Sequence, residues 1–224
     1  MSLPSCQARA ALPLVEAARR AGAAAWLEAR LYEVVGAWTG TTNDPQLKVW
    51  FEIASQHHAW RAELWRARLP ARLVPNYPPG DDGTSGRAPA SDPLAAGRGT
   101  GHGGANMVRP PSDRDEVALS LLAGLSGDAV RLAVYGRVVQ PRVIALYRQW
   151  WAACSPASDG PIARALRMAI TDAAEDWQSG TELLGELLAG PGGEELLARA
   201  AHASVQVELA ILAAGWGTDW GLGA

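Results

Sequence analysis

Apolar residues recur at every third or fourth position along most of this chain, which is the spacing of a helix that buries one side. The first such segment runs from about residue 12 to 38, where Leu27, Leu31, Val34 and Trp38 fall on one face. Alternation of apolar and polar residues with a period of two, the pattern of a half-buried strand, does not extend over any run of strand length. Ala and Leu, both strong helix formers, dominate the apolar residues. The pattern predicts an all-α protein.

A second helix is predicted from Pro45 to about Leu69. Asp44 can cap its N-terminus, Pro45 suits the first helical position, and Pro70 ends it. The connection between the first two helices is short, so we expect them to pack as an antiparallel hairpin. The apolar stripe of the second helix consists of Leu47, Phe51, Ala54, His58, Ala62, Trp65 and Leu69.

Residues 70–112 differ in composition from the rest of the chain, with eight Pro and eight Gly among 43 positions. Such a segment cannot bury enough apolar surface to offset the entropy lost on ordering. We predict a long, disordered crossover that runs along a helical bundle. It separates an N-terminal helical hairpin, residues 1–69, from C-terminal helices of the same bundle, residues 113–214, which are followed by a loose tail, residues 215–224.

The helical pattern resumes after Ser112, a capping residue with Asp115 and Glu116 in the turn that follows. It continues to about Ala153, with a break at 126–128 and a kink expected at Pro141. Two further helices are predicted, from Pro161 to about Leu188 and from Glu194 to about Ala214. The chain is thus expected to contain four main helices and a short fifth one.

Charge and cysteine content narrow the class of protein. The net charge is −3 and the basic residues are spread along the chain, whereas a nucleic-acid-binding protein usually presents a basic face. Cys6 and Cys154 are too few for a disulfide framework and indicate free thiols. The N-terminus lacks the charged start and apolar core of a signal peptide, and the stretch Ala203–Gly217 is shorter than the ~20 residues of a membrane span. We therefore expect a cytoplasmic protein that binds neither nucleic acid nor membrane, and the heavy use of Ala, Gly, Arg and Trp suggests a bacterial source.

Acidic residues and histidines suited to metal binding lie on three of the predicted helices. A carboxylate-bridged two-metal site takes one Glu from each of two helices and a Glu-x-x-His pair from each of two others. The candidate ligands are Glu33 in the first helix, Glu52, His57 and His58 in the second, and Glu175 and Asp176 in the fourth. Together with the long connection after the second helix, this arrangement resembles the ferritin-like superfamily. The resemblance implies an antiparallel four-helix bundle and iron or manganese as the cofactor.

The chain departs from the ferritin-like pattern in two ways. It contains no Glu-x-x-His motif, because Ala54 and Ser55 occupy the positions three residues before His57 and His58. In addition, no acidic residue occurs between Asp128 and Asp159, so the third helix offers arginines rather than ligands. A complete two-metal site drawn evenly from four helices is therefore not available.

The two adjacent histidines allow several roles. Neighbouring helical residues point about 100° apart, so His57 and His58 do not suit a single metal ion. His58 falls on the apolar stripe, where a buried histidine needs a hydrogen-bond partner such as a Glu or Tyr on a facing helix. Metal ligation and acid–base catalysis are the alternatives to this structural role.

The candidate acids also have alternatives. Glu33 lies away from the apolar stripe of its helix and should be solvated, unless Trp26 marks a second buried side. Asp172, Glu175 and Asp176 either pair with arginines of the preceding helix or contribute to a site. Eight of the ten tryptophans should lie mostly in the core, although several of them around one cavity would make an apolar ligand pocket. They are Trp26, Trp38, Trp50, Trp60, Trp65, Trp150, Trp151 and Trp177.

Three functional classes follow. The first is an accessory or interaction protein of ferritin-like architecture without a complete di-metal site, which the missing ligands favour. The second is a metal-dependent oxidative enzyme with an altered site that binds iron or manganese. The third is a binder of apolar small molecules. A homo-oligomer or another protein partner fits the first class.

Overall fold

The computed structural model describes residues 12–70, 107–155 and 157–216, and within these ranges every regular element is a helix, which confirms the predicted all-α class. Most of the predicted crossover, residues 71–106, and most of the predicted tail, residues 217–224, lie outside the described residues. The elements are α1 (Leu14–Thr39), α2 (Pro45–Arg66), α3 (Asp113–Ala123), α4 (Asp128–Val134), the π-helix η3 (Tyr135–Val139), α5 (Gln140–Ala153), α6 (Gly160–Ala189) and α7 (Gly193–Ala213).

The first two helices, α1 and α2, form the most extensive contact in the described structure, and α2 begins as predicted. The Asp44 carboxylate accepts hydrogen bonds from the backbone N–H groups of Gln46, at 2.8 Å, and Leu47, at 3.1 Å. These bonds satisfy two of the donors that a helix N-terminus leaves free. The apolar stripes of the two helices, which include Leu27 and Phe51, are buried against each other.

The helix count differs from the predicted four main helices and a short fifth one. The predicted break at 126–128 is confirmed: Gly127, with a positive φ of 87° that favours glycine, lies between α3 and α4. The segment between Ser112 and Ala153 therefore folds as two helices, of which α4, η3 and α5 form the second without interruption. The last helix, α7, has 21 residues and is not short.

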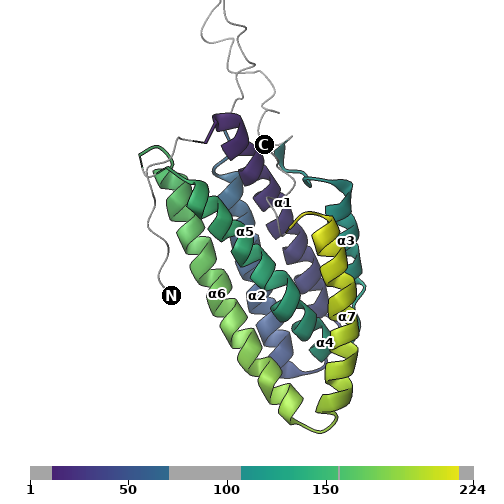
Figure 1. Ribbon diagram of the computed structural model, residues 1–224. Coiled ribbons are helices and arrows are strands. Elements are labelled where there is room, and N and C mark those ends of the chain that lie inside the picture. The colour runs from purple at the N-terminus through teal and green to yellow at the C-terminus, as the bar shows by residue number, and fades with distance from the viewer. Residues whose placement is uncertain (1–11, 71–106, 156, 217–224) are drawn as a thin grey trace, which may run out of the picture.

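Figure 1 shows α6 along one side of the bundle and α7 beside α3 on the other, the two diverging from the turn that joins them. The helix α5 packs against α6, and α2 also contacts α6. The helix α7 contacts α3 and α4, and α3 contacts α1. The interior between α1, α2, α5 and α6 is thus enclosed by long helices.

A π-helical turn lies directly before Pro141, where the sequence predicts a kink. Proline has no N–H to donate, and its ring clashes with the preceding turn of an α-helix. In η3 the backbone N–H of Gln140 instead bonds to the carbonyl of Tyr135, so the turn holds one residue more than an α-helical turn. This extra residue changes which side chains downstream face the interior.

Both ends of the described C-terminal half are packed. Gly22 of α1 lies so close to Met107 that a Cβ would stand 2.1 Å from the Met107 carbonyl oxygen. The prediction of disorder for residues 70–112 is therefore wrong at Met107, which packs on α1. After α7, Trp216 is fully buried and its indole N–H donates to Asp115 at 2.7 Å. The prediction of a loose tail from residue 215 is therefore wrong for Trp216.

Among the described residues one helix, α7, is long and apolar enough to cross a membrane by length and composition alone. It begins ten residues before the apolar stretch singled out in the sequence, and only 17% of the window that meets the criterion is buried.

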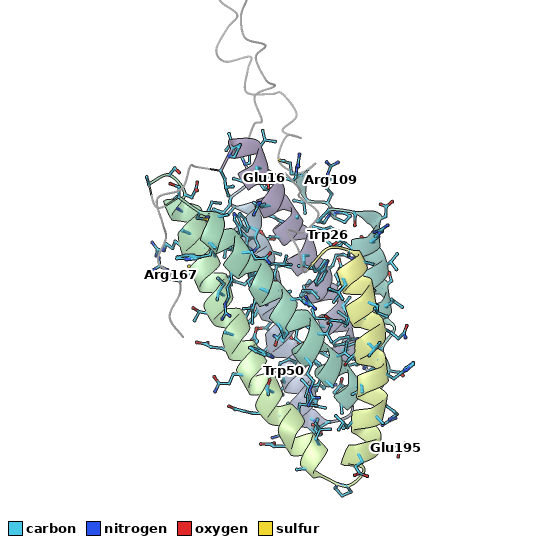
Figure 2. The ribbon with its side chains drawn as sticks, viewed as in Figure 1. Glu16, Trp26, Trp50, Arg109, Arg167 and Glu195 are labelled. Atoms are coloured by element: carbon cyan, nitrogen blue, oxygen red, sulfur yellow. The ribbon has the colours of Figure 1, made fainter. Side chains whose placement is uncertain are left out.

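A close approach between α2 and α6 gives a test of this packing. The side chain of Trp50 lies between the two helices (Figure 2), and a Cβ added at Gly180 would stand 2.6 Å from its ring. Gly180→Ala should therefore displace the indole, which donates to Ser179 Oγ at 3.0 Å, and lower the free energy of unfolding by about 1–3 kcal/mol. Urea denaturation measures this change.

The matched control is Gly185→Ala in the same helix, where an added Cβ meets nothing within 4 Å. This variant should raise stability by up to about 1 kcal/mol through helix propensity alone. Equal effects of the two substitutions would contradict the packing of Trp50 on Gly180.

Candidate functional site: a buried charge cluster around Arg61

Six polar side chains from four stretches of helix meet in the interior. Each is at most 5% exposed, which is rare for charged groups unless they are paired. They are Glu28 from α1, His58 and Arg61 from α2, Tyr135 from η3, Tyr147 from α5 and Asp176 from α6.

The guanidinium of Arg61 is the centre of this cluster. Its Nε donates to Glu28 Oε2 at 3.0 Å, and its Nη1 donates to Asp176 Oδ2 at 3.4 Å. One cation therefore bridges carboxylates from two helices, α1 and α6, that have no direct chain connection. The planar fork of donors in Arg suits this task better than the single ammonium of Lys.

His58 links the carboxylate of Glu28 to the phenol of Tyr135. Its Nδ1 contacts Glu28 Oε2 and its Nε2 contacts the Tyr135 hydroxyl. Because the Glu28 carboxylate accepts, Nδ1 carries the proton, and Nε2 accepts from the tyrosine. Nη2 of Arg61 lies 3.0 Å from the same Nδ1, and with that nitrogen protonated this approach is a packing contact. The predicted kind of hydrogen-bond partner for a buried His58, a Glu or a Tyr on a facing helix, is confirmed.

The second oxygen of Glu28 is also satisfied. The Tyr147 hydroxyl donates to Glu28 Oε1 and accepts from the indole N–H of Trp65 at 3.0 Å. The Trp65 ring stacks on Trp150 with ring centroids 4.9 Å apart. The carboxylate thus has hydrogen-bond partners on both oxygens, and Tyr147 connects it to Trp65 of the aromatic core.

Burial and charge act in opposite directions on these groups. Burial alone would raise the pKa of Glu28, but the Arg61 guanidinium, helped by His58 and Tyr147, lowers it to about 2. Burial lowers the pKa of His58, against the opposing effect of Glu28, so the imidazole stays neutral. Burial also raises the pKa values of Tyr135 and Tyr147, so both remain phenols. At neutral pH the cluster therefore contains a carboxylate, a neutral imidazole, two phenols and a guanidinium, next to Asp176.

His57 is the part of this network that reaches the surface. Its Nδ1 lies 2.7 Å from Asp176 Oδ1, and its side chain is 41% exposed. Asp176 accordingly contacts a buried cation on one oxygen and a half-exposed histidine on the other.

The structure brings together three of the six candidate metal ligands, His57, His58 and Asp176. The other three lie at the surface: Glu33 pairs with Arg30, Glu52 accepts from Gln56 Nε2 at 3.0 Å, and Glu175 is exposed. The alternative in which Glu33 is solvated is therefore correct. Asp176 pairs with Arg61 of α2 rather than with an arginine of the preceding helix, which corrects that expectation.

The donor set does not fit a metal centre. In the described ranges no group of three or more His, Cys, Asp or Glu side chains is placed to hold an ion. The acids closest to His58 are engaged by Arg61. A dication at this place would have to displace a guanidinium that is itself only 1% exposed.

The tryptophans divide between core and surface. Trp38, Trp65 and Trp150 are buried as predicted, and Trp38 packs edge-on against Phe51 at 5.3 Å between centroids. Trp60 and Trp177 are 40% and 38% exposed, which corrects their assignment to the core.

Arg61, Tyr135 and Tyr147 were missed by sequence reasoning, and Glu28 was not among the predicted ligands. Arg61 follows His58 by three residues and so shares its helix face, which was a usable signal. No such signal pointed to the two tyrosines. In a regular α-helix the twelve residues from Tyr135 to Tyr147 would rotate the two side chains about 120° apart around the helix axis, and the extra residue of η3 reduces this angle to about 20°.

No protein-family model, curated protein or solved structure matches this chain. The interpretation of the site therefore depends on its own geometry.

Removing the central cation should destabilise the fold. Arg61→Met leaves Glu28 and Asp176 buried without their partner, so the free energy of unfolding should fall by about 3–5 kcal/mol. The control is Arg66→Met in the same helix, where the pair with Glu63 is exposed and should contribute less than about 1 kcal/mol. Adding Glu28→Gln to Arg61→Met should cost less than the two single effects summed. Strict additivity would contradict the coupling.

Stability should fall as the pH decreases, in two ranges. The pKa of His58 is lowered from 6.5 in the folded protein, so below that pH the imidazole binds a proton in the unfolded chain but stays neutral in the folded one. This difference lowers the free energy of unfolding as the pH falls. The pKa of Glu28 is lowered from 4.5 to about 2; at about 1.4 kcal/mol per pKa unit this adds a loss on the order of 3 kcal/mol between these pH values. Urea denaturation from about pH 7 down to about pH 2 measures both losses. Glu28→Gln should flatten the lower range only, and a wild-type protein of constant stability would refute the assignment.

Proposed function

We propose that this chain is a ferritin-like bundle in which a guanidinium stands in place of metal ions, and that it acts as an accessory or interaction protein. Three features support the architecture: the antiparallel pair α1–α2, the long connection that follows it, and a second pair, α5–α6. In bundles of this kind, polar side chains from facing helices converge in the interior. Here they converge on Arg61.

The observation that carries the proposal is the burial of Arg61 between two carboxylates. Metal ions in such bundles balance the charge of inward-facing acids, and Arg61 already supplies a cation to Glu28 and Asp176. A guanidinium remains charged at any pH that the protein meets. Binding of a dication would have to overcome repulsion from Arg61 or its expulsion from the core, which is strongly unfavourable.

Exposed apolar side chains support the interaction role. Val49, Ile53 and Trp60 of α2 are 59%, 47% and 40% exposed and follow one another at helical spacing. A second exposed apolar stripe lies on α7. Contiguous apolar surface on a soluble bundle is typical of a protein that binds another protein.

The test is the metal content of protein purified without chelator, measured by inductively coupled plasma mass spectrometry. We expect far less than one ion per chain and no change in Tm on adding Fe²⁺ or Mn²⁺, since a ligand that binds the folded state would raise Tm. Stoichiometric iron or manganese that is lost in a His57→Ala, His58→Ala variant would overturn the proposal and favour an oxidative metalloenzyme.

A gain-of-binding variant tests the role of Arg61 itself. Arg61→Ala leaves Glu28, His58 and Asp176 without their cation, so Mn²⁺ is expected to raise the Tm of this variant while leaving that of the wild type unchanged. Arg66→Ala, at the exposed pair with Glu63, is the control. An Arg61→Ala variant whose Tm does not change on adding Mn²⁺ would show that Arg61 does not stand in place of a metal.

A further inference from the structure

The helix α7 presents an apolar face to solvent along most of its length. Leu197, Val205, Leu209 and Leu212 are 43%, 55%, 59% and 47% exposed, and Ala198 and Ala201 are exposed beside them. The opposite face packs on α3 and α4 and buries Ala200, Val207 and Ile211. Apolar residues spaced by three and four on an exposed face indicate a second packing surface.

A shallow groove marks the middle of this face. It has a volume of about 440 Å³ and lies between η3 and α7. Its lining includes Arg137, Val138, Ala201, Val205, Glu208 and Leu209. The exposed stripe and the groove therefore coincide at Val205.

We propose that α7 of a second copy packs antiparallel on this face, with a two-fold axis at Val205. The sequence around that residue is complementary to itself under such an axis. Residues four positions to either side, Ala201 and Leu209, face each other, and so do Ala198 and Leu212, seven positions away. A large side chain thus meets a small one at each of these contacts, as close packing between helices requires.

The charges agree with a second copy of this chain. Within the described residues Arg137 makes no ion pair or hydrogen bond, whereas Glu208 pairs with Arg142. Both Arg137 and Glu208 line the groove on the same flank of α7, and in an antiparallel pair like flanks face each other. The axis therefore brings Arg137 of one copy toward Glu208 of the other.

The same charges argue against a membrane surface as the occupant. The helix α7 contains Glu194, Glu195 and Glu208 but only one basic residue, Arg199. Helices that lie on anionic membranes carry Lys and Arg on their polar face.

The first experiment is light scattering coupled to size-exclusion chromatography on the full chain. The wild type should elute with twice the 23.6 kDa mass of one chain, and Val205→Glu should elute as a monomer with an unchanged helical circular dichroism spectrum. The matched control is Val49→Glu on the exposed face of α2, which should remain a dimer. A monomeric wild type at about 100 μM, or a dimer broken by Val49→Glu and not by Val205→Glu, would overturn the proposal.

Cross-linking tests the position of the axis. In a Cys6→Ser background, Val205→Cys should form a disulfide-linked dimer on mild oxidation, because a residue on the axis meets its own copy. Val49→Cys should not. A dimer that Cys at position 205 fails to cross-link would refute the antiparallel register, and sedimentation of a monomer with vesicles of neutral and anionic lipids would identify a membrane as the occupant.

This inference rests on the proposed interaction role, yet the two can fail separately. A metal-loaded protein that dimerises through α7 would refute the metal-free function and support the interface. A metal-free monomer would refute the interface and agree with the metal-free function.

Discussion

The buried ion pairs of Arg61 with Glu28 and Asp176 are the interaction on which the interior of this bundle depends. Each charge alone would be strongly unfavourable in a closed apolar core, and together they are tolerated only because nearly every oxygen and N–H finds a partner. Since the partners come from α1, α2 and α6, the pairs also connect helices that are far apart in the chain. His58, Tyr135 and Tyr147 extend this network through hydrogen bonds, whereas the buried Asp115 forms a separate one with Ser112 and Trp216.

The local geometry of the fourth stretch of helix, Asp128–Ala153, follows from one residue and serves the same network. Pro141 cannot donate a backbone hydrogen bond, and the π-turn before it adds a residue to the helix. The result is that Tyr135 and Tyr147 both point inward, where the Tyr135 hydroxyl donates to His58 and the Tyr147 hydroxyl donates to Glu28. A backbone irregularity at this place therefore has a function in the packing, in keeping with the frequent position of π-turns at functional sites.

Much of the fold could be predicted from the sequence, because helix formation depends on periodicity and capping within a short window. The bounds of α1, α2 and α6, the Asp44 cap and the partners of His58 were all accessible in this way. The cluster was not, because it depends on which faces of distant helices meet. Three of the candidate ligands have suitable chemistry but lie on the solvent-facing sides of their helices, namely Glu33, Glu52 and Glu175. Arg61 was overlooked because arginine is rarely buried. The inward turn of Tyr135 required the π-turn, which periodicity with a fixed step of 100° cannot reveal.

The composition of the helices explains why a network of this kind is useful. The first half of the helix α1 buries Ala18, Ala21, Ala23, Ala24 and Ala25, whereas large apolar side chains such as Leu31 and Trp38 are buried in its second half. The flat, small-residue half fixes the sliding of one helix on another only weakly, because few large side chains interlock there. Hydrogen bonds between charged groups tolerate little displacement. A shift of α2 by one turn would leave Arg61 buried without Glu28 and Asp176, a far larger penalty than any loss of alanine contacts. The polar cluster thus adds a penalty against other registers to the one that hydrophobic packing imposes.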